Sequence, residues 1–155
     1  MNKIHNTSII GKNTIIGSNV EIGPYCVVED GVKIGNENIL HSNVYMSGET
    51  DIGNGNTFFP FCSIGSQPQD LKYQGEKSKL IIGDENIFRE HSTANPGTLS
   101  DNMKTVIGSS SLFMIGAHIA HDCIIGDKVI MANQATLGGH VQVDNFAVLG
   151  GLSAV

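Results

Sequence analysis

The chain has 155 residues, about the length of one domain, and charged residues make up 15% of it. This is well below the roughly 25% of an average soluble domain, while the 19 glycines lie above the usual share, so the composition favours a sheet-rich repeat protein over a helical one. The net charge of -6 argues against nucleic-acid binding through a basic surface. No stretch approaches the roughly 18 apolar residues of a membrane span, and the first residues lack the apolar core of a signal peptide. We therefore expect one cytoplasmic domain over residues 1–155.

Apolar residues recur at every sixth position. One run reaches from Ile4 to Ile64 without a miss, Ile82 keeps the same phase, and a run shifted by one position reaches from Ile107 to Val155. A fixed short period is typical of a solenoid, in which each repeat packs on its neighbours. The repeated positions, here called anchors, are Ile4, Ile10, Ile16, Ile22, Val28, Ile34, Leu40, Met46, Ile52, Phe58, Ile64, Ile82, Phe88, Ile107, Phe113, Ile119, Ile125, Met131, Leu137, Val143, Leu149 and Val155.

A second inward position lies four residues after each anchor and is mostly small. All three cysteines, Cys26, Cys62 and Cys123, fall in this class, which predicts buried core residues rather than reactive thiols or a disulfide framework. Short extended stretches alternate with turns in which Gly, Asn and Asp accept unusual φ angles, and Asn19 and Asn36 occupy such turns. Each six-residue unit is thus one flat side, and three sides close a triangular coil of eighteen residues. The predicted fold is an all-β parallel β-helix.

The period is interrupted twice, about Gln67 to Lys79 and about Pro96 to Thr105. These segments predict two loops that leave the triangular prism and return to it.

The sequence Gly116 to Cys123, Gly-Ala-His-Ile-Ala-His-Asp-Cys, places two histidines close together in an otherwise regular repeat. His121 lies two residues after the anchor Ile119, so we expect it on a side of the prism, where an imidazole can act as a general base. Gly139 follows eighteen residues later and should stack beside His121, where its N–H could stabilise an oxyanion. Asp122 can support His121 only if the backbone turns there, because neighbouring strand residues face opposite ways.

Four segments together resemble the hexapeptide-repeat UDP-N-acetylglucosamine 3-O-acyltransferases of lipid A synthesis. They are Gly116 to Cys123, Leu137 to Val141 (Leu-Gly-Gly-His-Val), Gln69 to Tyr73 (Gln-Asp-Leu-Lys-Tyr) and Ile87 to Glu90 (Ile-Phe-Arg-Glu). The resemblance implies a left-handed helix, an exception to the right-handed rule for parallel crossovers. It also implies a homotrimer with active sites in the clefts between neighbouring prisms.

The same resemblance implies the reaction and the site. An (R)-3-hydroxyacyl group moves from acyl carrier protein to the glucosamine 3-hydroxyl of UDP-N-acetylglucosamine, without a metal or organic cofactor. The implied catalytic residues are His121 as base, Asp122 as its supporting carboxylate and Gly139 as oxyanion donor. The implied substrate contacts are Gln69, Asp70, Lys72, His118 and His140.

Two departures from the family pattern stand out. The family usually has Ile-His-Arg-Gly-Thr where this chain has Ala94 to Thr98, Ala-Asn-Pro-Gly-Thr, so Asn95 replaces a substrate-side histidine. Asn keeps hydrogen bonding but cannot become cationic, which predicts an altered substrate contact. The sequence also stops at Val155, before the family's next His-Gln pair, further coils and helical region. We therefore expect a truncated chain with impaired activity.

Three alternatives stay open at this stage. The related N-acyltransferases share the fold, but they are expected to have Asn after the second histidine. A zinc-dependent β-helix carbonic anhydrase would need three nitrogen ligands, and His118-x-x-His121 is not the spacing associated with that family. A non-catalytic scaffold would assemble through an open coil end. Acyl chain length, and a 3-hydroxyl against a 3-amino acceptor, cannot be decided from the sequence.

Overall fold

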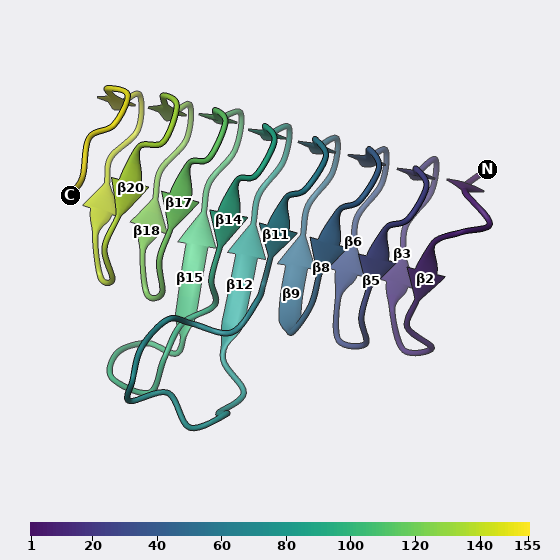
Figure 1. Cartoon of the computed structure of the whole chain (residues 1–155), viewed down its shortest axis with the longest axis horizontal. Coiled ribbons are helices and arrows are strands. Elements are labelled where there is room, and N and C mark those ends of the chain that lie inside the picture. The colour runs from purple at the N-terminus through teal and green to yellow at the C-terminus, as the bar shows by residue number, and fades with distance from the viewer.

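The structure, a computed structural model, describes residues 1–155. It consists of 22 short β-strands without a helix, and thus has no helix that could span a bilayer. The strands form three parallel sheets that are the faces of a long triangular prism (Figure 1). Sheet 1 contains β1 (Lys3–Ile4), β4 (Glu21–Ile22), β7 (Ile39–Leu40), β10 (Thr57–Phe58), β13 (Ile87–Phe88), β16 (Leu112–Phe113), β19 (Ile130–Met131) and β22 (Val148–Leu149). Sheet 2 contains β2 (Ile9–Ile10), β5 (Val27–Val28), β8 (Tyr45–Met46), β11 (Ser63–Ile64), β14 (Thr93–Ala94), β17 (His118–Ile119) and β20 (Thr136–Leu137). Sheet 3 contains β3 (Ile15–Ile16), β6 (Lys33–Ile34), β9 (Glu49–Ile52), β12 (Lys79–Ile82), β15 (Lys104–Ile107), β18 (Ile124–Ile125) and β21 (Gln142–Val143).

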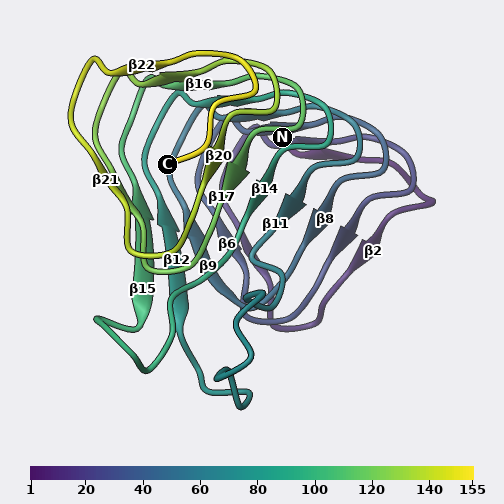
Figure 2. The same cartoon turned by 60° about the vertical axis from the view of Figure 1, so that its left-hand side comes forward.

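Each strand pairs in parallel with the strand one coil further along, which stacks anchor on anchor. Ile4 pairs with Ile22, and Ile119 pairs with Leu137, in each case eighteen residues on. Figure 2 shows the strands of sheet 2 lying side by side from β2 to β20. The predicted triangular coil of three six-residue sides is confirmed.

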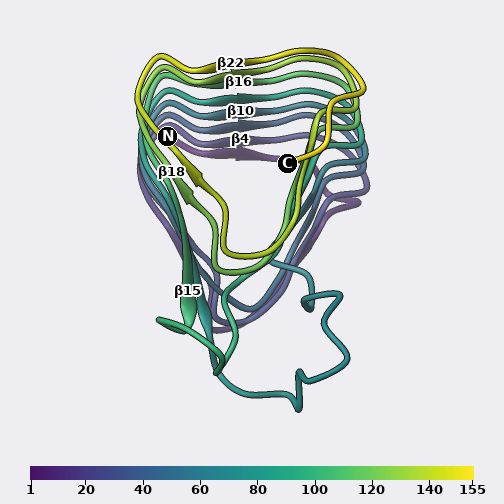
Figure 3. The same ribbon diagram turned by 90° about the vertical axis from the view of Figure 1, so that its left-hand side faces the viewer.

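The hand of the helix follows from the view along its axis. Figure 3 looks from the C-terminal end, and the last coil runs clockwise from β21 through β22 to the C-terminus while it advances toward the viewer. Clockwise rotation with advance toward the viewer makes the β-helix left-handed, as the family resemblance implied.

The anchors fill the prism. The hydrophobic core contains 27 buried residues, and three of its phenylalanine rings form a stack. The ring centroids of Phe58 and Phe88 lie 5.0 Å apart, and those of Phe88 and Phe113 lie 4.7 Å apart. Offset-stacked aromatic rings add to the hydrophobic burial of their faces. The prediction for the cysteines is also confirmed: all three are free and buried, and burial raises the pKa of Cys62 to about 12.

Two features of the interior escaped the sequence pattern. Ala94 is a buried anchor, paired between Ile64 and Ile119, although the sequence analysis did not count it among the anchors. Some second inward positions are polar rather than small and apolar. Their side chains form a buried ladder along the prism, in which each oxygen accepts a hydrogen bond from a backbone N–H of a neighbouring coil. The ladder consists of Asn38, Asn56, Asn86 and Ser111.

Asn19 and Asn36 serve the turns in different ways, although the sequence analysis gave both the same role. A positive φ recurs three residues after an anchor, at Asn19 (57°) for example. Asn36, by contrast, serves through its side chain, because its Oδ1 accepts the Ser18 N–H at 2.8 Å. The glycines that directly follow an anchor mostly lack a positive φ. They allow coils to approach: a Cβ at Gly53 would lie 2.7 Å from the Gly83 carbonyl oxygen.

Both predicted loops are present, and both leave the prism at the same edge. The first connects β11 to β12, and the second connects β14 to β15, so each passes from sheet 2 to sheet 3. Figures 2 and 3 show both loops projecting below this edge. Residues of the two loops are thereby brought beside the edge residues of the coils that follow.

The buried ladder provides a test of what holds the coils together. In Asn56→Ala, the Asn86 N–H loses its acceptor and the Gly83 carbonyl loses a donor, because Asn56 serves both. Buried groups left without partners each cost about 1–3 kcal/mol, so we expect the free energy of unfolding to fall by about 2–4 kcal/mol. Urea unfolding measures this value. The control Asn133→Ala changes an exposed side chain without a hydrogen bond and should stay within about 0.5 kcal/mol. Equal effects of the two variants would contradict the role of the ladder.

Candidate active site

His121 and Gly139 lie on the same edge of the prism, one coil apart. The pairing of Ile119 with Leu137 continues into the turn, where the His140 N–H donates to the His121 carbonyl oxygen at 3.0 Å. This is the edge from which both loops project. The adjacency predicted from the eighteen-residue coil is therefore confirmed.

Gly139 lies against the face of the His121 imidazole. A Cβ at Gly139 would lie 2.4 Å from Cε1 and 2.7 Å from Nε2 of His121, so a larger residue would displace the ring. The Gly139 N–H donates no hydrogen bond within the chain. The position thus offers both close approach to the backbone and a free donor next to an imidazole.

Asp122 turns back toward His121 because the chain bends there. Its φ of 60° is in the left-handed region, which Asp tolerates better than most residues. Nδ1 of His121 lies 2.9 Å from Oδ2 of Asp122, and the His121 side chain is only 15% exposed. The condition set by the sequence analysis, a backbone turn at Asp122, is met.

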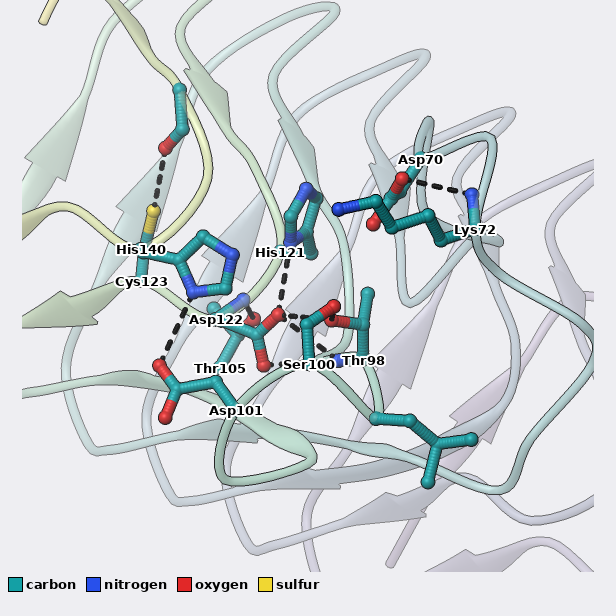
Figure 4. A network of polar contacts seen from close by, with 12 residues as sticks. Asp70, Lys72, Thr98, Ser100, Asp101, Thr105, His121, Asp122, Cys123 and His140 are labelled. Atoms are coloured by element: carbon teal, nitrogen blue, oxygen red, sulfur yellow. Dashed lines mark hydrogen bonds and ion pairs between the residues drawn. The ribbon is translucent and has the colours of Figure 1, made fainter.

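The Asp122 carboxylate is buried and is held by the second loop (Figure 4). The Thr98 hydroxyl donates to Oδ2 at 2.6 Å, and the Thr98 N–H donates to Oδ1 at 2.9 Å. Burial by itself raises the pKa of Asp122, but the hydrogen bonds from Thr98 and His121 outweigh it and hold the pKa below the ordinary value. Asp122 is thus an ionised acceptor for the His121 Nδ1–H, which leaves Nε2 of His121 without a partner in the chain.

His118 lies outward on β17 beside the same edge. Its Nδ1 is 2.7 Å from the Thr93 hydroxyl oxygen. Burial lowers the pKa of His118, and the neighbouring His121 lowers it further. At neutral pH this imidazole is therefore uncharged and suited to hydrogen bonding rather than to ion pairing.

His140 stands next to His121. The two rings meet edge to face, with centroids 5.1 Å apart and an interplanar angle of 87°. Nδ1 of His140 lies 3.2 Å from Oδ2 of Asp101 in the second loop. Each of the two histidines therefore has a carboxylate at Nδ1.

The first loop brings Gln69, Asp70 and Lys72 to this edge. Oδ1 of Asp70 accepts the Lys72 N–H at 2.9 Å, which fixes a tight turn. Gln69 and Lys72 are exposed, and the Lys72 side chain extends toward His121 in Figure 4. The first loop leaves the prism at the same edge as the histidines, and the role of these residues as substrate contacts stays a prediction.

Asn95 differs from the expectation of an altered substrate contact. The residue is 4% exposed, and its Nδ2 donates to the carbonyl oxygens of Ser66 at 2.9 Å and Gln67 at 3.4 Å. The Nδ2 of this short amide is engaged by the start of the first loop, and its Oδ1 is buried without a hydrogen-bond partner. Asn95 holds the base of that loop rather than presenting a polar group at the surface.

Three contacts were missed by the sequence analysis: Thr98 with Asp122, Asp101 with His140, and Thr93 with His118. Thr98 lies in the segment that was compared with the family pattern, but no role was predicted for it. Asp101 gave no signal, because only the path of the second loop brings it to His140.

Three potential metal ligands lie close together at this edge. Ligand atoms of His121, Asp122 and His140 lie within 4.8 Å of one another. This donor set has two imidazoles and one carboxylate instead of three imidazoles, and both oxygens of Asp122 already accept hydrogen bonds. The grouping is accounted for by the hydrogen bonds within it.

No cavity of the single chain includes His121. The largest cavity, of about 660 Å³, lies elsewhere, against Ile4, Ile22 and His41 on sheet 1 and the turn that follows it. The histidine edge is an outer ridge of the prism.

Comparisons with known proteins agree with this arrangement. The family model described as bacterial transferase hexapeptide (six repeats) matches residues 13–48 and 104–139. Over 147 residues, 95% of this chain, the sequence is 50% identical to the acyl-[acyl-carrier-protein]–UDP-N-acetylglucosamine O-acyltransferase of Thermodesulfovibrio yellowstonii, and it covers 57% of that protein.

Solved structures give the same result. LpxA from Acinetobacter baumannii superposes with a TM-score of 0.97 at 47% identity, covering 97% of this chain and 58% of that chain. The UDP-N-acetylglucosamine acyltransferase from Campylobacter jejuni superposes with a TM-score of 0.94 at 38% identity, covering 98% of this chain and 59% of that chain. The present chain thus spans a little more than half the length of these relatives. By sequence, fold and coil register, the chain belongs to the UDP-N-acetylglucosamine acyltransferase family of hexapeptide-repeat proteins.

Proposed function

We propose that the chain carries the transfer site of an O-acyltransferase that moves an (R)-3-hydroxyacyl group from acyl carrier protein to the 3-hydroxyl of UDP-N-acetylglucosamine, the first step of lipid A synthesis. The observation that carries the proposal is the His121–Asp122 pair stacked on Gly139. It occurs in a chain that is 50% identical to a relative named for this transfer.

In the proposed mechanism, Nε2 of His121 accepts the proton of the sugar hydroxyl. The hydroxyl oxygen attacks the thioester carbonyl, a C–O bond forms, and the negative charge moves to the carbonyl oxygen. The Gly139 N–H, which has no acceptor within the chain, donates to this oxyanion. Collapse of the intermediate breaks the C–S bond, and the His121 imidazolium returns its proton to the leaving thiolate.

Asp122 completes the base. By accepting the Nδ1–H of His121, it fixes the tautomer that leaves Nε2 free, and its negative charge stabilises the imidazolium that forms. Its lowered pKa keeps it ionised at neutral pH.

The remaining residues are proposed as substrate contacts. Neutral His118 and solvent-exposed His140 flank the base, so they can hydrogen-bond the acceptor sugar or the acyl donor. Gln69 and Asp70 offer hydrogen-bonding groups from the first loop, and Lys72 offers a positive charge for the diphosphate. Because Asn95 is buried, we assign it the support of this loop.

The proposal includes a cytoplasmic homotrimer. No cavity of one chain includes His121, and we propose that a neighbouring chain completes the cleft around the substrates. The outer face of sheet 1 also carries a row of partly exposed apolar residues, among them Ile87, Ile130 and Val148, which a subunit contact would cover.

The first test of function is acyl transfer. With 3-hydroxyacyl-acyl carrier protein and UDP-N-acetylglucosamine, the purified chain should form an ester at the sugar 3-position. His121→Ala should lower kcat by at least about a thousandfold, because it removes the general base. The matched control His5→Ala changes an exposed histidine far along the prism and should retain full transfer.

The same assay is repeated on a chain extended to the length of its relatives. The comparison distinguishes low activity of the present chain from an incorrect assignment of the function. Near-normal turnover by His121→Ala would remove this residue from the role of base. No transfer by either length of chain would refute the proposed function.

The second prediction concerns the charge on Asp122. Because its folded pKa lies below the unfolded value of about 3.9, Asp122 stabilises the fold above pH 4, and this stabilisation disappears as pH falls through the folded pKa. Asp122→Asn should lower the free energy of unfolding by about 1–3 kcal/mol at pH 7. The difference from wild type should shrink as pH falls from about 4 to 2. Urea unfolding across this range measures it, with Asp144→Asn as the control for loss of an exposed carboxylate. A difference independent of pH would show that Asp122 is not the ionised partner of His121.

The third prediction concerns assembly. We expect light scattering to give three times the chain mass over a wide range of concentration. Val148→Glu and Ile130→Glu, which place charges on the apolar row of sheet 1, should dissociate the trimer without unfolding the coil. A stable monomer would contradict the proposed cleft, and continuous growth with concentration, without transfer, would favour a scaffold.

A further inference from the structure

The second loop reaches both histidines that flank Gly139. Thr98 donates to the Asp122 carboxylate from both its N–H and its hydroxyl, and this carboxylate in turn accepts from His121. Asp101 lies at Nδ1 of His140 (Figure 4). Both contacts come from four consecutive residues. The orientation of two imidazoles from neighbouring coils therefore depends on the path of one short segment.

The contact through Thr98 is built into the interior. Thr98 is 1% exposed and Asp122 is 3% exposed, so water cannot replace the hydroxyl that donates to Oδ2. Asp122 is held from the other end of the loop as well, because its N–H donates to the Thr105 hydroxyl oxygen at 2.8 Å. Residues on either side of the excursion thus fasten the partner of His121. A carboxylate held in this way allows the imidazole one orientation and one tautomer.

The contact through Asp101 is of another kind. The side chains of Asp101 and His140 are 39% and 44% exposed, so their pairing adds little to stability. Its effect is directional: an acceptor at Nδ1 places the proton of neutral His140 there and leaves Nε2 as an acceptor. The edge-to-face contact of the two rings then keeps His140 at a fixed angle to His121.

The segment is also joined to the first loop. The Leu99 N–H donates to Oε1 of Glu76 at 3.1 Å, and Oε2 of Glu76 accepts the Gln74 N–H at 2.8 Å. Glu76 therefore connects the loop of Asp70 and Lys72 to the segment that holds the histidines.

From these contacts we propose that residues 98–101 form a positioning element, in which Thr98 orients His121 through Asp122 and Asp101 orients His140 directly. The inference rests on the proposed transfer reaction, in which both imidazoles face the substrates. Neither Thr98 nor Asp101 touches the reacting atoms. Their contribution is to present Nε2 of both rings toward the space beside Gly139.

The test compares variants that remove each contact with variants that keep it. Thr98→Val removes the hydroxyl at nearly constant volume, and Thr98→Ser retains it. Asp101→Ala removes the acceptor, and Asp101→Asn retains an acceptor oxygen without the charge. Asn102→Ala, in the same loop, changes an exposed side chain without a hydrogen bond and is the control.

Two measurements are made on the whole chain. The ¹⁵N chemical shifts of the imidazole nitrogens report the tautomers, and steady-state transfer gives kcat and KM. We expect Thr98→Val to lower kcat about 10- to 100-fold with little change in KM and to reduce the Nδ1–H tautomer of His121, and Thr98→Ser to restore both. Asp101→Ala should reduce the Nδ1–H tautomer of His140 and leave that of His121 unchanged, and Asp101→Asn should restore most of it.

Unchanged tautomers in Thr98→Val and Asp101→Ala would overturn the proposal, as would a fall in kcat that Asn102→Ala reproduces or that follows the melting temperature alone. The tautomers can be read whether or not the chain transfers acyl groups. Absence of transfer by wild type would therefore count against the proposed function, while the nitrogen shifts would still decide whether the segment positions the histidines.

Discussion

The in-register pairing of two-residue parallel strands is the constraint on which the rest of the molecule depends. A strand this short has almost no stability of its own, so each side of the prism is held by the coil before it and the coil after it. The register is therefore set by contacts inside the prism. The rings of Phe58, Phe88 and Phe113 stack on one another. The side-chain amides of the buried ladder accept hydrogen bonds from backbone N–H groups of the next coil. Once the register is set, residues eighteen apart on the outer surface are neighbours. His121 and Gly139 are one such pair.

The six-residue period was sufficient to predict the three-sided coil, the core and the adjacency of His121 with Gly139. It worked because each anchor must face inward, and a single apolar position per side repeats without variation over most of the chain. It failed at Ala94, where a methyl group does not stand out from its surroundings although the position is fully buried. It also failed at the buried asparagines, because a polar residue inside a solenoid becomes understandable only when its backbone partners on the next coil are known.

The part of the candidate site that follows from the regular repeat could be predicted from the sequence. The side of the prism on which His118 and His121 lie follows from their distance to the anchor Ile119. The direction of Asp122 does not follow from alternation, because its positive φ belongs to the turn and reverses the expected face. Thr98 and Asp101 could not be predicted at all. Their positions depend on how a loop of irregular backbone folds back onto the edge, and no period describes that path.

The two loops leave the prism at one edge, and this arrangement separates what the solenoid must keep from what it is free to alter. Strands on the three faces cannot gain or lose a residue without turning an anchor outward. A segment inserted at the edge does not have this effect, because β12 and β15 resume the parallel strand pairing wherever the inserted segment ends. The histidines and Asp122 belong to the regular coils, whereas Thr98 and Asp101 belong to the insertion. A change of loop sequence can therefore supply new hydrogen-bond acceptors or donors, while the strand pairing keeps His121 and Gly139 in place.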